Sequence, residues 1–449
     1  MIARLLIANR GAIARRIVRA CDALGIHSVA LYSEADADAP HLLEASSSVG
    51  LPGVSAADTY LNAPAIINAA QACGADGIHP GYGFLAEDAD FAAAVTAAGL
   101  QFVGPSAASI RLMGDKLTAR KTLAELGLPL FPGSGPLTDL DQAQGTAAQI
   151  GYPLLIKPAA GGGGIGMQKV EQAADFAAAF ARASQLAGAI FGDDRLFLEQ
   201  LITGARHIEF QLLGDVHGQV QHLYERECSV QRRHQKLIEE SPAPGIASAT
   251  LLELAERGES ALAQIGYSNL GTLEMLLAPD GRFGVLEVNT RIQVEHAVTE
   301  MVTGVDLVQS QIRLAAGESL RSVLPQRPAP DGFAVEARIY AEDPVLQQAS
   351  TGRLSRFELP NMTHVRVETG YSAGQSVTPY YDPLLAKIIA WGTTRELAMG
   401  RLGVALRAAQ ISGVKTNIAT LQGVLASEPF VQGRFTTDTD TTMLNTVRA

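Results

Sequence analysis

The chain has 449 residues, of which 47% are hydrophobic and 18% are charged, and its formal net charge is −11 at pH 7. This length exceeds what one hydrophobic core usually organises, so we expect two or three domains that share a cleft. The acidic balance argues against a nucleic acid or an anionic membrane as a partner held by bulk charge.

The first hundred residues predict a parallel sheet. An apolar strand at residues 4–9 (RLLIAN) is followed by Gly11, by a helix with one apolar face, and by a second strand at residues 27–33. Similar units follow at residues 59–83 and 91–105. These βαβ units predict a parallel, Rossmann-like domain over residues 1–113. The G-x-G-x-x-G fingerprint is missing after the first strand, so the pattern does not support a dinucleotide site.

The middle of the chain predicts antiparallel strands. Residues 132–149 form a polar stretch with Gly and Pro, which predicts a loop into a second domain. Alternating apolar segments follow between residues 152 and 229, and a helix at residues 251–266 precedes two strands joined by the turn Asp280-Gly281. We expect a domain at residues 114–329 with a mobile lid at about 131–203, and a mixed α/β domain at residues 330–449.

Four successive glycines form the most conspicuous loop, and Ile165 and Gly166 follow them: Gly161, Gly162, Gly163 and Gly164. Backbone N–H groups without a Cβ can close around phosphate oxygens. The loop has no G-K-[ST] and precedes an apolar segment (MQKV), so it predicts a hairpin lid over a nucleotide rather than a Walker loop. The alternative is a flexible surface loop.

Two predicted strands each carry one acid among apolar neighbours, Glu274 and Glu287. Buried carboxylates that lie close together need a cation, and Mg²⁺ held by one or two carboxylates and substrate phosphates meets that need. The alternative is a structural pairing with arginine.

After Glu287, every second residue is polar as far as Glu295. If the strand continues, these side chains share one face, opposite Val288, Ile292 and Val294. One face would then offer a metal ligand, a cation, an amide and a carboxylate, which could hold a small anion beside a general base. A solvated edge strand would also alternate in this way. The residues of the row are Glu287, Asn289, Arg291, Gln293 and Glu295.

Three segments are dense in cations. Lysines on otherwise apolar strands predict phosphate ligands, because an unpaired ammonium is costly when it is desolvated. Spacing alone gives no role to Arg338 or Tyr82. Together with the acids, the cations indicate ATP, Mg²⁺ and a small anionic acceptor. For each cation alone, the alternative is a surface charge or a core ion pair. The cations of the three segments are Lys116, Lys157, Arg226, Arg232, Arg233, His234 and Lys236.

Long segments in order resemble those of the biotin carboxylase family of ATP-grasp ligases, over nearly the whole chain. They include IHPGYGFLAE, MGDK, KPAAGGGGIGM, ERECSVQRRHQK, EESPAPG, LEVNTRIQVEHAVTE, RIYAEDP and PYYDPLLAK. The resemblance implies a multidomain α/β and α+β chain, with an ATP-grasp domain between a Rossmann-like domain and a mixed C-terminal domain. It implies carboxylation of biotin on a biotin carboxyl carrier protein, with ATP, Mg²⁺ (or Mn²⁺) and bicarbonate, through carboxyphosphate.

The resemblance also implies roles for residues that match the family motifs. Glu274, Glu287 and Asn289 would hold the metal ion. Glu295 would deprotonate bicarbonate, and Arg338 would stabilise the biotin enolate. The residues that would bind bicarbonate are Arg291, Gln293, Val294 and Lys236. Tyr82 would lie near the ureido ring of biotin, and the nucleotide would contact Lys116, Lys157, Gly161, Gly162, Gly163, Gly164, Gly166, Glu199, Gln200, Ile202, His207, Gln231 and His234.

Neither a biotin-attachment motif (M-K-M) nor a carboxyltransferase segment is found in the sequence. We therefore expect one subunit of an acyl-CoA carboxylase, with carrier and carboxyltransferase partners, and a homodimer by family resemblance. Ile165 stands where the glycine loop of the family usually has an arginine. With this isoleucine, the loop resembles that of the biotin carboxylase part of urea carboxylases, so a urea-carboxylase-like enzyme is an alternative. Another ATP-grasp carboxylate ligase and a catalytically silent homologue are further alternatives.

The cysteines predict a reducing compartment. Cys21, Cys73 and Cys228 lie far apart without C-x-x-C spacing, so neither a disulfide framework nor a zinc site is indicated. We expect a cytoplasmic protein. The short apolar run near Met1 is broken by Gly and Arg and predicts no signal peptide, and no apolar run approaches the ~20 residues of a membrane span.

Overall fold

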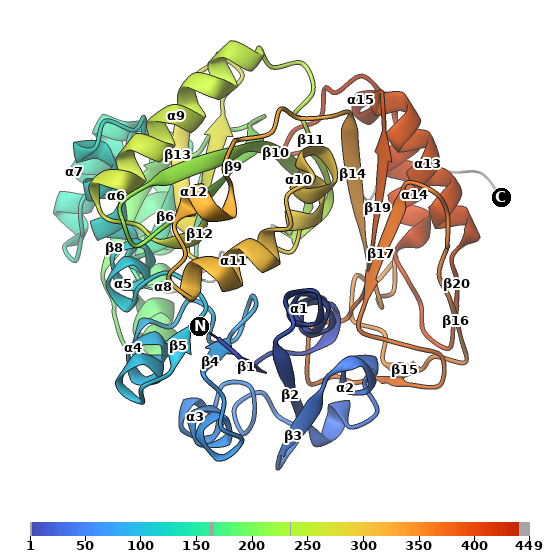
Figure 1. Ribbon diagram of the computed structural model, residues 1–449. Coiled ribbons are helices and arrows are strands. Elements are labelled where there is room, and N and C mark those ends of the chain that lie inside the picture. Colours follow the sequence, from blue (N-terminus) through green and yellow to red (C-terminus); the bar gives the residue numbers. More distant parts are fainter. Residues whose placement is uncertain (1, 161–165, 234, 440–449) are drawn as a thin grey trace.

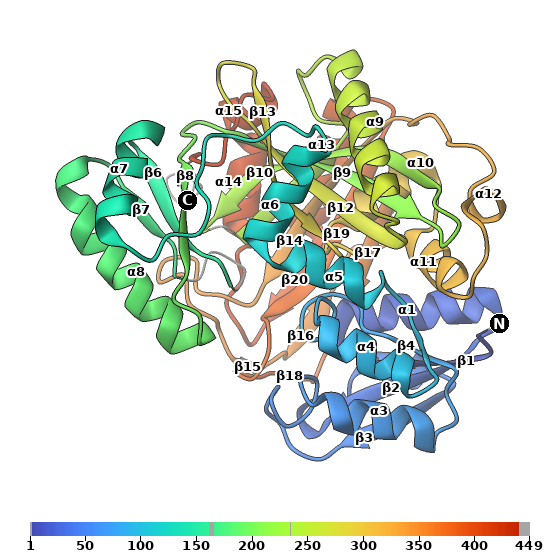
Figure 2. The same cartoon turned by 90° about the vertical axis from the view of Figure 1, so that its left-hand side faces the viewer.

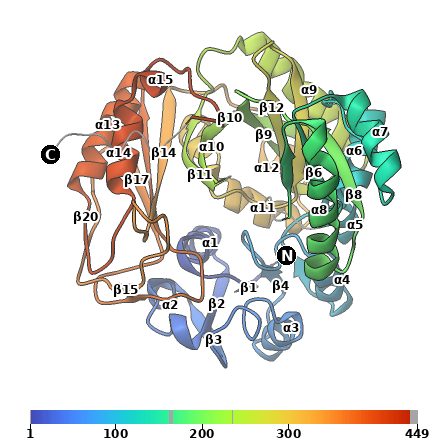
Figure 3. The same ribbon diagram turned by 180° about the vertical axis from the view of Figure 1, so that it is seen from behind.

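The computed structural model describes residues 2–160, 166–233 and 235–439, so Gly161, Gly162, Gly163, Gly164 and His234 lie outside the described residues. Figure 1 shows the N-terminal part in blue, the central part in green and yellow, and the C-terminal part in orange and red. Seen from behind in Figure 3, the three parts again lie side by side. In the described ranges, no helix has both the length and the apolar character needed to cross a membrane.

The N-terminal part contains the predicted parallel sheet. Its strand order is β3-β2-β1-β4-β5, and every neighbouring pair is parallel. The predicted strand, helix and strand at its start are confirmed. The elements are β1 (Arg4–Ile7), α1 (Gly11–Leu24), β2 (His27–Ser33), α2 (Pro40–Glu44), β3 (Ser47–Leu51), α3 (Ala63–Ala72), β4 (Gly77–His79), α4 (Ala89–Ala97), β5 (Gln101–Phe102) and α5 (Ala107–Gly114).

An eight-stranded antiparallel sheet spans the central and C-terminal parts in the order β13-β12-β9-β10-β11-β14-β19-β17. It continues across residue 330 because β11 pairs with β14. The predicted antiparallel strands and the turn Asp280-Gly281 are confirmed. The strands are β9 (Arg206–Gly214), β10 (Val220–Arg232), β11 (Gln235–Ser241), β12 (Asn269–Leu277), β13 (Phe283–Asn289), β14 (Phe333–Tyr340), β17 (Val365–Thr369) and β19 (Leu384–Gly392).

Helices cover this sheet and connect the three parts. Helix α9 (Ser248–Gln264), predicted from its periodicity, packs against β10 and β9. Helix α1 contacts both α11 and β17, so it joins the N-terminal part to the central part and to the C-terminal part. The other helices are α6 (Lys116–Glu125), α10 (His296–Thr303), α11 (Leu307–Ala315), α12 (Leu320–Val323), α13 (Arg395–Ala408), α14 (Ile418–Ala426) and α15 (Glu428–Val431).

A separate three-stranded sheet lies beside the large sheet, on the left of Figure 2. It consists of β6 (Leu154–Pro158), β7 (Gln168–Val170) and β8 (Leu196–Gln200), with α7 (Leu140–Ile150) and α8 (Phe176–Phe191). Strands β6 and β7 are antiparallel, which confirms a strand after the glycine-rich segment.

The predicted loop at residues 132–149 is wrong over its second half, where α7 forms. Asp139 caps the helix by accepting a hydrogen bond from the Gln142 amide. Ala143 and Ala147, four residues apart, are buried on one face. Small apolar residues within a polar stretch therefore sufficed for a helix. The remaining short strands are β15 (Gly352–Arg353), β16 (Arg356–Glu358), β18 (Ser376–Val377) and β20 (Gln410–Ser412).

Candidate active site

Three carboxylates form a row across neighbouring strands of the large sheet. Strand pairing places Glu274 of β12 directly opposite Glu209 of β9 on one side and Glu287 of β13 on the other. Like charges in such cross-strand positions destabilise a sheet. The row therefore requires cations.

Lys236 of β11 supplies one of these cations. Its Nζ lies 2.6 Å from Glu209 Oε2, 2.9 Å from Glu274 Oε1 and 2.6 Å from Glu295 Oε1. Glu295 itself is 1% exposed. The predicted bicarbonate ligand Lys236, metal ligand Glu274 and base Glu295 therefore meet at one point.

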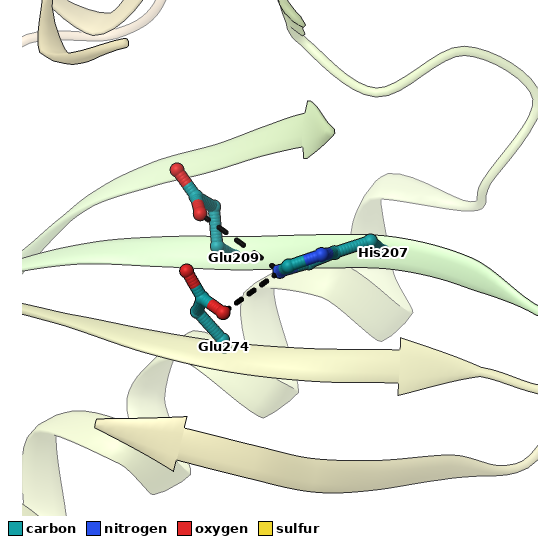
Figure 4. A group of neighbouring side chains, drawn as sticks. All are labelled: His207, Glu209 and Glu274. Carbon is teal, nitrogen blue, oxygen red and sulfur yellow. Dashed lines mark ion pairs between the residues drawn. The ribbon is translucent and has the colours of Figure 1, made fainter. Parts of the chain in front are cut away.

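His207 approaches the same carboxylates from β9, as Figure 4 shows. Its Nε2 lies 3.1 Å from Glu274 Oε2 and 4.0 Å from Glu209 Oε2, and its Nδ1 lies 2.8 Å from Gln231 Nε2. Burial is the largest influence on the pKa of His207 and lowers it, but the charges of Glu274 and Glu209 and the hydrogen bond with Glu274 together outweigh burial, so the pKa is raised. The predicted nucleotide ligands His207 and Gln231 thus contact each other beside the carboxylates.

Glu295 lies between two cations. Besides the contact with Lys236, its Oε2 accepts a hydrogen bond from Arg338 Nη2 at 2.9 Å, and Arg338 also pairs with Glu239. Burial alone would raise the pKa of Glu295, but Lys236 and then Arg338 hold it well below its usual range. Glu295 is therefore ionised at neutral pH, as a general base must be.

The predicted continuation of the strand through residue 295 is wrong, because β13 ends at Asn289. The polar side chains nevertheless converge. Arg291 donates from Nη2 to Asn289 Oδ1 at 3.0 Å and from Nη1 to Gln293 Oε1 at 2.7 Å. Gln293 Nε2 in turn donates to Glu274 Oε1 at 2.9 Å. These hydrogen bonds keep the row together after the strand ends.

Thr290 and Arg291 are also held by a residue of the N-terminal part. Glu87 Oε2 accepts from Arg291 Nε at 2.7 Å, and Glu87 Oε1 accepts from the Thr290 amide at 2.9 Å. The buried Nδ2 of Asn289 has no hydrogen-bond partner among the described residues. It is therefore available to a ligand.

The predicted nucleotide lysines lie near the three-stranded sheet of β6, β7 and β8, which we call the lid sheet because it falls within the predicted lid at about residues 131–203. Lys157 of β6 pairs with Glu199 of β8, whose other oxygen accepts from Arg120 Nη1 at 2.7 Å. The prediction that Lys116 lies on an apolar strand is wrong, because Lys116 is the first residue of α6. Burial, the largest influence, lowers the pKa of Lys116, although Glu287 opposes this effect.

The segment after Glu199 offers backbone groups to a ligand. The amides of Gln200 and Leu201 donate to the carbonyls of Pro132 (2.9 Å) and Pro153 (3.1 Å). In the described part of the chain, the Ile202 amide and the buried Oε1 of Gln200 have no hydrogen-bond partner. Both remain available to a ligand.

Tyr82 lies close enough to Arg338 for that charge to lower the pKa of its hydroxyl, although burial outweighs this effect. Its ring is partly buried next to the core formed by β1, α1 and α11, and its carbonyl accepts from Asn9 Nδ2 at 2.8 Å. Burial raises the pKa of its hydroxyl. Across the described ranges, no side-chain hydrogen bond joins Tyr82 to another predicted site residue.

Gly166 is the one glycine of the loop that the structure describes, and it has φ +78°.

Sequence reasoning missed several carboxylates of the site. Glu209 could have been found, because it lies between His207 and Gln211 at the same spacing of two in an apolar strand. Glu239 in β11 lacks this signal, because the residue two positions before it is Leu237. Glu87 shows no local signal, because its contact with Arg291 depends on a loop 204 residues away.

The described residues contain three groups of ligand-type side chains whose donor atoms lie within 4.8 Å of one another. The first is His207, Glu209 and Glu274 (Figure 4). The others are Glu209, Cys228 and Glu295, and His296, Glu300 and Glu368. Glu287 belongs to none of them. Its pKa is raised, first by burial and then by the charge of Glu274, although Lys116 and Arg291 oppose this rise.

Two further buried carboxylates lie behind Arg338. Glu239 and Glu336 are directly opposite on β11 and β14, and both are fully buried. Burial raises the pKa of Glu239 to about 7 and that of Glu336 to about 8. Part of this pair is therefore protonated at neutral pH.

We expect Glu336→Gln to flatten the pH dependence of stability. The folded-state pKa of Glu336 lies above the unfolded value of 4.5, so its favourable contribution is complete below pH 4.5 and is lost as pH rises through about 8. Calorimetric unfolding between pH 6.5 and 8.5 should show stability that declines with pH. The decline should be shallower in the variant, by at most about 1.4 kcal/mol per pH unit. Equal slopes would show that Glu336 does not exchange a proton on unfolding.

Comparisons with known proteins agree with this arrangement. The chain matches "Biotin carboxylase, N-terminal domain" over residues 1–110, "Carbamoyl-phosphate synthase L chain, ATP binding domain" over residues 115–323, and "Biotin carboxylase C-terminal domain" over residues 336–441. It is 45% identical to "Biotin carboxylase 2" of Bacillus subtilis over 440 residues, which cover 98% of this chain and 99% of that protein.

Two further relatives are parts of larger carboxylases. The mitochondrial methylcrotonoyl-CoA carboxylase subunit alpha of rice is 46% identical over 96% of this chain and 59% of its own length. The biotin carboxylase domain dimer of Hydrogenobacter thermophilus 2-oxoglutarate carboxylase, solved with MgADP, ADP and bicarbonate, has a TM-score of 0.94 and 43% identity, covering 97% of this chain and 96% of that one. The expected ATP-grasp fold is confirmed, and the chain belongs to the biotin carboxylase family of ATP-dependent ligases.

Proposed function

We propose that this chain carboxylates the biotin of a carrier protein, with ATP, Mg²⁺ and bicarbonate, as the biotin carboxylase subunit of an acyl-CoA carboxylase. One observation carries the proposal. Glu295 is buried and ionised between Lys236 and Arg338, next to the row of carboxylates. In this proposal, Glu295 is the base, Lys236 the cation that would bind bicarbonate and Arg338 the cation that would stabilise biotin.

Glu274 and Glu287 are the residues that would hold Mg²⁺, with Asn289 beside them. Their direct opposition on β12 and β13 and the raised pKa of Glu287 fit a pair of carboxylates that would share a divalent cation. Mn²⁺ would fit the same oxygen ligands. Bound there, the cation would neutralise charge on the phosphates during transfer.

The bicarbonate would bind where Lys236, Arg291, Gln293 and Val294 meet. Glu295 would accept its proton, so that the anion attacks the γ-phosphate and forms carboxyphosphate. Release of CO₂ from that intermediate leaves phosphate, which would take the proton from biotin N1′. Arg338 would stabilise the biotin enolate, with Tyr82 near the ureido ring. Catalysis of this kind rests on positioning and charge neutralisation.

The nucleotide would lie between the large sheet and the lid sheet. Among the described residues, the Ile202 amide and the Gln200 Oε1 have no hydrogen-bond partner. Both support an adenine-binding role for the segment that begins at Glu199. In this proposal, the lid at about residues 131–203 closes over ATP. The other contacts would come from Lys116, Lys157, His207, Gln231 and His234, and from the glycine loop with Gly161, Gly162, Gly163, Gly164 and Gly166.

The partners would be a biotin carboxyl carrier protein and a carboxyltransferase, and the chain would form a homodimer in the cytoplasm. The methylcrotonoyl-CoA carboxylase subunits among the relatives support an acyl-CoA acceptor. Cys21, Cys73 and Cys228 form no disulfide in the described chain, as suits a reducing compartment. Mass spectrometry of proteins that co-purify with the chain would identify the carboxyltransferase. A urea-hydrolysing partner would instead favour the urea-carboxylase-like alternative.

The test is ADP release by the purified chain with free biotin. We expect release that requires ATP, Mg²⁺, bicarbonate and biotin together, because the proposal assigns each substrate its own group of residues. Omission of biotin or of bicarbonate is the matched control. A chain that is stabilised by ATP in thermal unfolding, yet releases no ADP under the complete conditions, would contradict the proposal.

A further inference from the structure

Lys387 lies behind the loop that carries the candidate bicarbonate ligands. It stands on β19 directly opposite Arg338 of β14, and its side chain is 1% exposed. Its Nζ donates a hydrogen bond to the Val294 carbonyl and lies 2.8 Å from Glu368 Oε2. A buried ammonium is costly unless it is paired and hydrogen-bonded, so these contacts fix its position.

His296, the first residue of α10, holds the neighbouring carbonyl. Its Nδ1 lies 2.8 Å from the Gln293 oxygen. Burial lowers the pKa of His296 to about 4, so the ring is neutral at pH 7. Because a carbonyl can only accept, Nδ1 must carry the proton and donate it. Two buried side chains thus hold two consecutive carbonyls, those of Gln293 and Val294.

These contacts determine where the next two amides point. In a planar trans peptide, the C=O and N–H bonds point in opposite directions. The Val294 amide is therefore turned away from His296, and the Glu295 amide is turned away from Lys387. Among the described residues, neither amide donates a hydrogen bond. Successive unpartnered amides of this kind form an anion-binding concavity.

We propose that Lys387 and His296 are positioning residues for the anion: they hold the carbonyls of Gln293 and Val294 so that the Val294 and Glu295 amides face bicarbonate. The inference rests on the proposed function, because it takes bicarbonate as the anion. Neither residue touches the reacting atoms. Their contribution is to fix the donors before the substrate arrives, so that no reorganisation is needed during the reaction.

The first test is Lys387→Met, which keeps the approximate length of the side chain and removes its donor. We expect the KM for bicarbonate to rise by about tenfold or more while the KM for ATP stays within about twofold. Without Lys387, the Val294 carbonyl is no longer held and the Glu295 amide loses its orientation, and this change is confined to the anion site. Steady-state ADP release with free biotin measures both constants. A variant whose fold is only destabilised would not change the KM for bicarbonate without changing the KM for ATP.

Glu336→Gln is the matched control. Glu336 Oε2 lies 3.7 Å from Lys387 Nζ in the same buried cluster, but it makes no contact with the Val294 carbonyl. We expect both KM values to stay within about twofold in this variant, because the donor to Val294 remains. A rise of the bicarbonate KM equal to that of Lys387→Met would overturn the inference.

His296→Leu provides a second test, because it releases the Gln293 carbonyl without changing a charge. It should raise the bicarbonate KM selectively, and it remains informative if Lys387→Met does not fold. An unchanged bicarbonate KM in His296→Leu, or an equal rise of both KM values in either variant, would overturn the inference. If the unsubstituted chain shows no bicarbonate dependence, the proposed function has failed instead.

Discussion

Glu295→Gln is expected to lower bicarbonate-dependent ADP release by about 10²–10⁴-fold, the usual contribution of a general base. The replacement keeps the shape of the side chain and its capacity to accept one hydrogen bond, but it cannot take a proton. The KM for ATP should change little, because no contact of Glu295 reaches the lid sheet. Initial rates at saturating ATP and Mg²⁺, over a range of bicarbonate, would measure the effect.

The environment of Glu295 decides how this base can work. Lys236 and Arg338 hold its pKa well below 4.5, so it stays ionised from pH 6 to 9 and its ion pairs lose their stabilising effect only under acid conditions, below about pH 4.5. A carboxylate held so firmly is a weak base. Bicarbonate bound to Lys236 would draw that cation away from Glu295 and strengthen the base at the moment it is needed. The acid limb of the pH–rate profile should therefore belong to another group.

Glu300→Gln is the matched control for Glu295→Gln. Glu300 is also buried beside two arginines, Arg16 and Arg366, and its pKa is lowered to about 2 despite burial, first by Arg366. It lies five residues along the chain and contacts no candidate substrate ligand. We expect lower stability but retained turnover in this variant. Equal losses of turnover in the two variants would assign Glu295 a structural role.

Sequence patterns predicted the features that depend on local spacing. The parallel units before residue 113, the hairpin around the glycine loop and the pairing of β12 with β13 follow from periodicity and turn chemistry. The polar row from Glu287 to Glu295 follows from its spacing alone, because every second residue is polar. Its side chains do converge, although the backbone leaves the strand at Asn289.

Features that depend on contacts between distant segments could not be predicted from the sequence. Glu87 and Arg291 are hydrogen-bonded although they lie 204 positions apart in the sequence. Lys387 donates to the Val294 carbonyl across 93 positions. The continuation of one sheet through β11 and β14 is also invisible to periodicity, because each strand alternates regardless of its partner. Local patterns fix which face a residue occupies, whereas strand order fixes what lies opposite.

Glu287→Gln should separate stability from activity more sharply than any other substitution in the carboxylate row. Without a metal ion, Glu287 is unfavourable as an anion, because burial and the charge of Glu274 both raise its pKa. A neutral amide removes that repulsion, so the metal-free variant should unfold at the same temperature as the unsubstituted chain or at a higher one. Turnover at saturating ATP should nevertheless fall by about 100-fold or more, the effect of losing about 2.7 kcal/mol of charge stabilisation.

The measurement is ADP release as a function of Mg²⁺ at fixed ATP, paired with thermal unfolding in EDTA. Glu240→Gln is the control, because Glu240 is another buried carboxylate of the large sheet, and burial raises its pKa to about 7, but it pairs with Arg395 away from the site. Its Mg²⁺ dependence should stay unchanged. If Glu287→Gln kept the normal Mg²⁺ dependence, or if it destabilised the metal-free chain, Glu287 would be a structural carboxylate and the cation would have to bind on the other side of Glu274. That side holds His207 and Glu209, so the outcome would move the metal site by one strand and leave the rest of the proposed chemistry in place.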